Sequence, residues 1–309
     1  MFFFLACTAE TVDTGAAALP SLDPPAAGEG FQAKMSGRVA PYSEAWLCAV
    51  YDLDTTELSP VNWVEYLQNE GTHHMTLSTT VLAETPLEPG MYDCNELYTD
   101  SSLMEDAVMM FGTQGAGEGI LALPGGVVAM VPAGIQVVHE LHYVNPNDEE
   151  IELYSYLNAY TIPAEEVTDS IWGGQVRDET IVVPAGATAT EWTRCAFNED
   201  VEVHFLGSHT HALATEFRVA PFDGTAAGEV FYTNNDWHDP LITQYNPPLV
   251  VPAGSGFEYA CDYQNDGDTD VSYGYTAADE MCNLTIVFTP GSTTAECQVV
   301  QTSDGVLWE

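Results

Sequence analysis

Short apolar runs alternate with turn-forming residues along most of this chain. Gly, Pro, Asn and Asp bound these runs, which predict short strands. The clearest runs lie at residues 45–51, 75–82, 126–131, 136–144 and 151–160. Few windows hold a 3.6-residue period, and Pro60 interrupts the best of them, residues 56–68, so no helix is predicted there. The pattern indicates an all-β protein built from sandwiches or barrels.

The tetrapeptide Val-Pro-Ala-Gly occurs three times, and an alternating run follows each copy. The copies lie at residues 131–134, 183–186 and 251–254. Pro is tolerated at a strand edge and Gly supplies the turn, so each copy predicts a corner between strands. A short turn motif also recurs by chance, so the repeat supports β architecture more than it proves a duplication.

With 309 residues, just under half of them apolar, the chain is long enough for two ordinary domains. Residues 162–164, Ile-Pro-Ala, interrupt the strand pattern, and we expect the boundary there. The expected parts are an N-terminal β-sandwich over 31–163, a C-terminal β-sandwich over 164–300 and a tail over 301–309. Residues 8–30 are rich in Ala, Pro, Thr and Gly and predict a disordered tether.

The charge balance is strongly acidic, with 47 Asp and Glu against five Lys and Arg and a formal net charge of −42. This balance argues against nucleic acid and against an anionic membrane surface as partners. A solvated acidic surface, common on exported proteins in salty surroundings, is the ordinary interpretation. We expect a monomer that acts on a small molecule.

Seven cysteines are present and none forms a CxxC pair, which weighs against zinc-ribbon and thioredoxin-like sites. Six of them are spread along the chain and predict three disulfides, hence an oxidising compartment. The seventh, Cys7, follows the sequence Met-Phe-Phe-Phe-Leu-Ala and resembles the acylated residue of a bacterial lipoprotein signal, of which residues 1–7 would be the remnant. That run lacks a basic segment and is shorter than the roughly 7–15 apolar residues of a signal, so a free cysteine in a disordered tail is the alternative.

These features predict an exported protein, periplasmic or at the cell surface, that is held to the membrane only through a lipid on Cys7. No other segment approaches the length of a transmembrane helix.

The stretch Ser208–His211 reads Ser-His-Thr-His. Side chains at i and i+2 of a strand leave the same face, so His209 and His211 can bind one metal ion. Downstream, Met281 lies in the sequence Asp-Glu-Met-Cys-Asn. A thioether favours Cu(I) and imidazole suits both oxidation states, so the three favour copper over zinc. The alternatives are a polar cross-strand face for the histidines and core packing for the methionine.

The first half contains His73-His74-Met75 and, further on, His139 and His142. Neighbours in a strand point to opposite faces, so His73 and His74 can share a metal only at a strand end or a bulge. His139 and His142 differ by three and leave opposite faces, so only one can serve. Met75 is expected in the core. Alone, the His-His pair is weak evidence for a metal.

Four motifs occur in order: His-His-Met at 73–75, His-Tyr-x-Asn-Pro at 142–146, His-Thr-His at 209–211 and Asp-Glu-Met-Cys-Asn at 279–283. In this order and spacing they resemble the copper type II, ascorbate-dependent monooxygenases, the family of peptidylglycine α-hydroxylating monooxygenase and dopamine β-monooxygenase. The resemblance runs from about residue 31 to about residue 300. It implies two tandem jelly-roll-like antiparallel β-sandwiches that face each other across a cleft.

The resemblance also implies two copper ions. His73, His74 and His142 would hold the first, with His142 preferred to His139 because the family ligand precedes a Tyr. The other group, His209, His211 and Met281, would hold the catalytic copper, where oxygen is activated and the C–H bond is attacked. The two remaining histidines, His204 and His238, are expected to be hydrogen-bonded rather than ligating.

Three disulfides follow from the same resemblance, out of the 15 pairings that six cysteines allow. They are Cys48–Cys94, Cys195–Cys297 and Cys261–Cys282.

The implied activity is that of a copper-dependent monooxygenase, an oxidoreductase. It would hydroxylate a C–H bond of a small organic substrate with O2 and with ascorbate or a similar reductant. Peptidylglycine enzymes hold the peptide carboxylate with a basic residue and a tyrosine where this chain has Gly207 and Thr285; only Asn283 matches, as a substrate-binding residue. We therefore expect neither a peptide amide precursor nor dopamine as substrate. The alternative is a non-catalytic lipoprotein of the same fold that binds or stores copper, although six retained ligand positions favour the enzyme.

Overall fold

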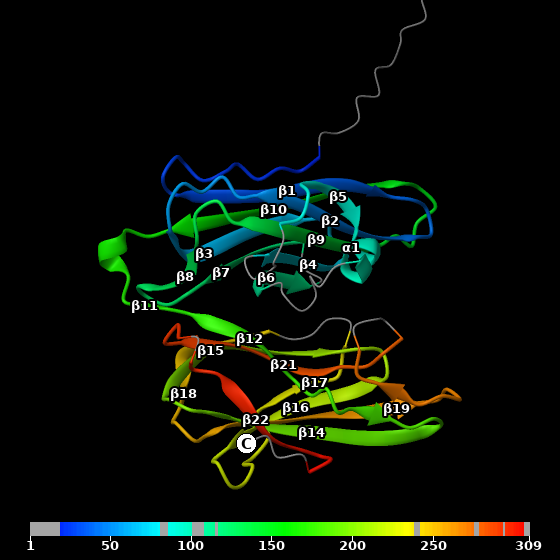
Figure 1. Cartoon of the computed structure of the whole chain (residues 1–309). Helices are drawn as coiled ribbons and strands as arrows, with labels where there is room; N and C mark the ends of the chain where they lie inside the picture. Colours follow the sequence, from blue (N-terminus) through cyan, green and yellow to red (C-terminus); the bar gives the residue numbers. More distant parts are fainter. Residues whose placement is uncertain are drawn as a thin grey trace, which may run out of the picture.

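The computed structural model describes residues 19–80, 86–100, 108–114, 117–237, 242–274, 278–292 and 294–305. Within them the protein is almost entirely β, and its sheets are antiparallel except where β8 (Val127–Val131) meets β11 (Asp169–Ser170). Figure 1 shows two bodies, one formed by the blue-to-green part of the chain and one by the green-to-red part. The expected all-β, two-sandwich fold is confirmed; the cleft between the two bodies stays a prediction.

Two sheets form the first sandwich, and its core lies between them. One has the order β1 (Gly30–Val39), β10 (Ile151–Thr161), β3 (Ser59–Gln68), β8 (Val127–Val131), β11 (Asp169–Ser170), with β7 (Glu118–Ala122) also paired to β3. The other has the order β5 (Gly90–Asp93), β2 (Glu44–Asp52), β9 (Gln136–Val144), β4 (Thr72–Thr79), β6 (Val108–Gln114). Met75 is fully buried in this core, as predicted, together with Leu141, Leu153 and Leu157.

The second sandwich has the same plan. Its first sheet has the order β12 (Trp172–Arg177), β21 (Cys282–Thr289), β15 (Val201–Thr210), β18 (Thr243–Val251). Its second has the order β17 (Tyr232–Asn234), β16 (Ala214–Phe222), β19 (Gly256–Asn265), β14 (Ala187–Phe197), β22 (Cys297–Thr302). A small pair, β13 (Val182–Val183) and β20 (Val271–Ser272), lies beside them. Aromatic side chains, among them Phe197, Phe217 and Tyr259, fill the core between the two sheets.

Few residues of the described part are helical. The short helix α1 (Cys94–Asp100) follows β5, and one 3-10 turn, η1 (Ala164–Glu166), precedes β11. Because β11 still pairs with β8, the chain leaves the first sandwich between β11 and β12, a few residues after the Pro163 boundary expected from the sequence.

The end of the stretch expected to be a disordered tether is attached to the first sandwich. Gln32 donates to the carbonyl of Leu22, and Asn158 donates to the carbonyl of Asp23. Backbone groups satisfied in this way hold the segment against β1 and β10. Cys7 and the rest of the expected lipoprotein signal lie outside the described residues.

Each Val-Pro-Ala-Gly copy is a corner between two strands, as predicted. Its glycine has a positive φ in all three copies: 57° at Gly134, 64° at Gly186 and 81° at Gly254. A residue without Cβ adopts this conformation at no steric cost. The motifs precede β9, β14 and β19.

Two of the copies extend into a longer structural repeat. Asn145 and Asn265 lie at the same number of residues after Val131 and Val251, at the ends of β9 and β19. The amide of Asn145 donates to the carbonyl of Glu149 and its oxygen accepts from the backbone of Asn147. Asn265 makes the same bonds, to the carbonyl of Thr269 and from the backbone of Gly267. The two sandwiches thus share the same turn after corresponding strands.

The structure contains the three disulfides that the resemblance implied, Cys48–Cys94, Cys195–Cys297 and Cys261–Cys282. Among the described residues, no helix has both the length and the apolar character needed to cross a bilayer. The disulfides are compatible with an exported protein.

We predict that Asn265→Ala lowers the free energy of unfolding by about 1–3 kcal/mol, because it leaves buried backbone groups of the β19 turn without partners. Asn265 is 2% exposed and also donates to the carbonyl of Val183. Denaturant unfolding measures the change. The neighbouring, exposed Gln264 is the control, and Gln264→Ala should stay within about 0.5 kcal/mol of the parent. Equal effects of the two substitutions would contradict this account of the turn.

Candidate metal centre

The strands β4 and β9 bring three histidines together at a β-bulge. Thr72 lies opposite Tyr143 and His74 lies opposite His142, so His73 is the extra residue of β4. A bulge turns the inserted residue out of the regular alternation. This is the condition under which the two neighbouring histidines can face one ion.

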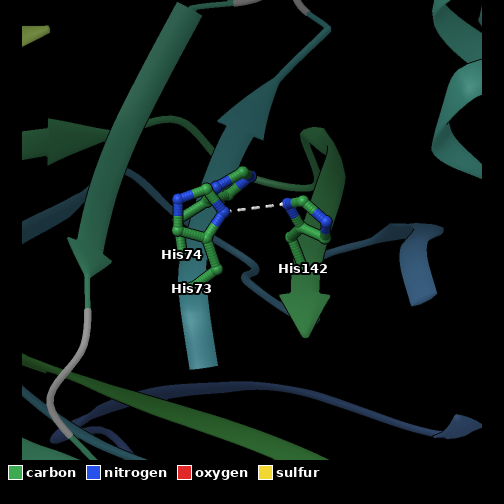
Figure 2. Close-up of side chains that lie close together, drawn as sticks. All are labelled: His73, His74 and His142. Carbon is green, nitrogen blue, oxygen red and sulfur yellow. Dashed lines mark hydrogen bonds between the residues drawn. The ribbon is translucent and has the colours of Figure 1, made fainter. Parts of the chain in front are cut away.

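Figure 2 shows the imidazoles of His73, His74 and His142 converging. One ring nitrogen from each lies within 4.8 Å of the others, and Nδ1 of His73 is 3.1 Å from Nδ1 of His142. Two nitrogens bound to one metal at roughly 2.0 Å each would lie at about this separation. All three side chains are half-buried. Their geometry fits a metal bound by three imidazoles.

Two of these rings are held by carboxylates through their other nitrogen. Nε2 of His74 donates to Glu140, and Nε2 of His142 donates to Glu44 over 3.1 Å. Such bonds fix the tautomer, leaving a lone pair on Nδ1 of each ring. Metal-binding histidines are held in the same way in other proteins.

Glu140 is the centre of a buried hydrogen-bond network. Besides His74 it accepts from Trp46 Nε1 at 2.7 Å, from Tyr98 OH at 2.7 Å and from Thr76 Oγ1 at 3.2 Å. Burial alone would raise the pKa of Glu140, but the charge and hydrogen bond of His74, with the bonds from Tyr98 and Trp46, lower it to about 2. The carboxylate is therefore anionic at neutral pH.

The sequence analysis did not assign a role to Glu140. A signal for it exists, because Glu140 and His142 are two apart in β9 and leave the same face. The donors that meet it, Trp46, Tyr98 and Thr76, come from β2, α1 and β4. No local pattern indicates that convergence.

His139 lies on the opposite face of β9, within the core, as expected of a residue three positions from His142. It is 0% exposed, and its nitrogens contact Tyr51 OH at 3.2 Å and Ser155 Oγ at 2.9 Å. Burial lowers the pKa of His139 to about 3, against the opposing charge of Glu140. It is a neutral structural residue.

The second group lies where β15 and β21 run side by side. His209 is opposite Asn283, Thr210 is opposite Cys282, and the ring centroids of His209 and His211 are 5.4 Å apart. Met281 directly precedes β21 and is 4% exposed. Strand pairing therefore places the two imidazoles and the thioether at one end of this sheet.

The carboxylate of buried Glu280 links the segment that carries His211 to the segment that carries Met281. Its carboxylate accepts from the backbone N–H groups of His211 at 3.1 Å, Leu213 at 2.6 Å and Met281 at 3.2 Å. Burial raises the pKa of Glu280 above its usual value, although these backbone bonds oppose the shift. The Cys261–Cys282 disulfide fixes the residue after Met281. Glu280 is a second structural carboxylate that the sequence analysis left without a role.

Both rings of this group suit metal binding. Nδ1 of His211 donates to the carbonyl of Asp279 over 2.9 Å, which leaves a lone pair on Nε2. Burial, followed by the charges of His211, His74 and Arg177, lowers the pKa of His209 to about 3. A neutral imidazole is the form that binds a metal. Two imidazoles and a thioether are soft, neutral donors that fit copper, as do three imidazoles.

The two groups belong to different sandwiches that contact one another. The Trp237 ring, in the second sandwich, lies edge-on to the His73 ring at 6.3 Å between centroids. Gln244 donates to the carbonyl of Ala122 across the boundary over 2.7 Å.

Of the two remaining histidines, the structure describes one. His204 is the bulged residue of β15, is 1% exposed and contacts Thr289 Oγ1 through Nε2 at 3.1 Å, so it is hydrogen-bonded as expected. His238 lies outside the described residues.

Residues 171–309 match the model of the C-terminal domain of copper type II ascorbate-dependent monooxygenases. That stretch contains His209, His211 and Met281. Residues 171–309 therefore form a domain of the copper type II ascorbate-dependent monooxygenase type. A domain of this type implies copper binding.

Solved structures resemble the chain only distantly. The crystal structure of the STIV MCP is 8% identical, with 85% of this chain and 95% of that chain covered and a TM-score of 0.30. The VP2 subviral particle of infectious bursal disease virus is 9% identical, with 91% and 76% covered and a TM-score of 0.20. Likenesses this weak carry no argument about structure or function.

We predict that Glu140→Ala weakens copper binding at the three-histidine group by about 10- to 100-fold, because His74 loses the acceptor that fixes its ring. Competition with a chelator of known affinity measures this change. Glu44→Ala should have a smaller effect on copper affinity. The Glu44 side chain is 69% exposed, so water competes for its hydrogen bond to His142. Glu150→Ala, which breaks an exposed ion pair with Arg38, is the control. Unchanged affinity in Glu140→Ala would show that the carboxylate does not position His74.

Proposed function

We propose that this protein is a copper-dependent monooxygenase that hydroxylates a C–H bond of a small organic substrate with O2 and with ascorbate or a similar reductant. The observation that supports this most is the presence of two differently composed donor groups in one chain. One offers three imidazoles, and the other offers two imidazoles and a thioether. Storage of copper does not require two such unlike groups.

The residues have separate tasks in this proposal. His73, His74 and His142 hold one copper, and His209, His211 and Met281 hold the other. Copper, when bound, supplies the one-electron chemistry that activates dioxygen. Glu140 and Glu44 orient the rings of the first group, and Glu280 holds the backbone on which His211 and Met281 are carried. Burial lowers the pKa of His142 and of His209, and a neutral imidazole retains the lone pair that binds the metal.

The residues at the positions expected to contact the substrate differ from those of peptidylglycine enzymes. Gly207, Thr285 and Gln175 lie in one row across β15, β21 and β12, so this row carries no charge. The substrate contact expected of Asn283 stays a prediction, and in the structure its amide nitrogen already faces two acceptors within the chain. These features support a substrate other than a peptide amide precursor or dopamine.

An exported location is part of the proposal. Three disulfides support an oxidising compartment. We propose further that a lipid on Cys7 anchors the protein in the periplasm or at the cell surface, and that it acts as a monomer. Radiolabelled fatty acid incorporation, compared between the parent and Cys7→Ser, tests the anchor.

The copper-binding lipoprotein without turnover remains the second candidate, favoured by the loss of the peptide-binding residues at Gly207 and Thr285. Oxygen consumption by the copper-loaded protein with ascorbate separates the two. The panel of test compounds includes aromatic amines, fatty acyl-glycines and small hydrocarbons. A monooxygenase shows uptake that depends on one of these compounds and yields its hydroxylated product. A carrier binds copper and shows no such dependence.

We predict that Met281→Ile abolishes substrate-dependent oxygen uptake, a loss of at least about 100-fold, because the second group loses its only soft sulfur donor. Met130→Ile is the matched control: Met130 lies on β8 of the other sandwich and is 39% exposed. Circular dichroism and thermal unfolding establish that both variants fold. Activity that survives in Met281→Ile would remove His209, His211 and Met281 from the oxygen-activating role.

A further inference from the structure

The sulfur of Met281 has a hydrogen-bond donor of its own. Nδ2 of Asn283 lies 3.2 Å from Sδ of Met281 and also 3.2 Å from Oε1 of Gln175. Asn283 is 0% exposed and Met281 is 4% exposed, so water does not compete for the bond to the sulfur. The amide of Asn283 thus joins a polar side chain of β12 to the thioether.

The orientation of the Asn283 amide follows from its neighbours. A thioether sulfur accepts hydrogen bonds and cannot donate one, so the group facing it must be the N–H. The reversed amide would set a carbonyl oxygen against the lone pairs of the sulfur. Both hydrogens of Nδ2 then have an acceptor, Met281 Sδ and Gln175 Oε1.

We propose that Asn283 and Gln175 are positioning residues for the thioether of Met281. A sulfur with two lone pairs that gives one to the Asn283 N–H has the other left for a metal. Because Asn283 lies directly opposite His209 in the strand register, this bond attaches the sulfur to the residue that faces His209 across the strands. Methionine is otherwise a flexible side chain with three rotatable bonds. The amide therefore supplies the fixed rotamer that a metal ligand needs.

Gln175 acts through Asn283 rather than on the sulfur. In the register Gln175 lies opposite Thr285 and Arg177 lies opposite Asn283, so Gln175 reaches Asn283 diagonally, across neighbouring strands. Its side chain is half-buried. Without this acceptor, the Asn283 amide is free to turn away from Met281. Gln175, Asn283 and Met281 thus form a relay of hydrogen bonds, in which Gln175 fixes the Asn283 amide and the amide fixes the sulfur.

This inference rests on the proposed role of Met281 as a copper ligand, and the experiment separates the two. X-ray absorption of the Cu(I)-loaded protein detects a sulfur bound to copper without any turnover. The parent should show one sulfur scatterer and Met281→Ile none. A parent without copper-bound sulfur would overturn the role of Met281, and with it the relay.

Three variants then test whether Gln175 and Asn283 position the sulfur. Asn283→Leu should lose the copper–sulfur signal, since leucine has similar size and no N–H. Gln175→Leu should weaken it, and Gln175→Glu should keep it, because a carboxylate also accepts from the Asn283 amide. Cu(I) affinity should follow the same order and fall about 10- to 100-fold in Asn283→Leu. Gln264→Leu, at an exposed position of β19, is the control.

The result that would overturn the relay is a parental sulfur signal in both Asn283→Leu and Gln175→Leu. Gln175→Leu keeps the test decisive if Asn283→Leu does not fold, because Gln175 is only partly buried. An equal loss in Gln175→Leu and Gln175→Glu would also contradict the mechanism, since only the leucine removes the acceptor.

Discussion

Cross-strand register is the constraint on which the whole site depends. In the first sandwich, the pairing of His74 with His142 and the bulge at His73 set three imidazoles on one side of the sheet. In the second, the pairing of His209 with Asn283 sets an imidazole beside the strand that Met281 precedes. A slip of one residue would move every side chain of a strand to the other face. The hydrophobic cores that fix the register are therefore also what hold the donor groups in place.

Buried carboxylates complete this arrangement in both sandwiches. An unpaired anion in a protein interior is costly, and it is tolerated only when donors surround it. Glu140 meets side-chain donors from three other elements, and Glu280 meets backbone N–H groups. Both therefore link segments that are distant in the sequence. In a chain of net charge −42, these two acidic residues are buried, as is Asp178, which accepts hydrogen bonds from Thr180 and Thr193.

Local patterns predicted much of the fold. Alternating runs predicted β2, β4, β8, β9 and β10 of the first sandwich, and the Val-Pro-Ala-Gly corners were confirmed. The rule that neighbours face opposite ways anticipated the bulge at His73. It also required that only one of His139 and His142 bind the metal, and the family resemblance selected His142. Family resemblance supplied the disulfides. What sequence did not reveal depends on tertiary packing: the donors around Glu140, the contact of Gln175 with Asn283, and the attachment of residues 22–23 to the first sandwich. None of these leaves a periodic signal.

The aromatic residues around the three-histidine group have a further consequence. The Trp46 ring lies 5.8 Å from that of His142 and 6.4 Å from that of His74, and Trp237 reaches His73 from the other sandwich. A paramagnetic Cu(II) ion quenches indole emission at such short range, whereas diamagnetic Cu(I) does so far less. The intrinsic fluorescence of the protein should accordingly follow the oxidation state of a metal bound there. The Trp237 share of that emission should in addition follow any separation of the two sandwiches.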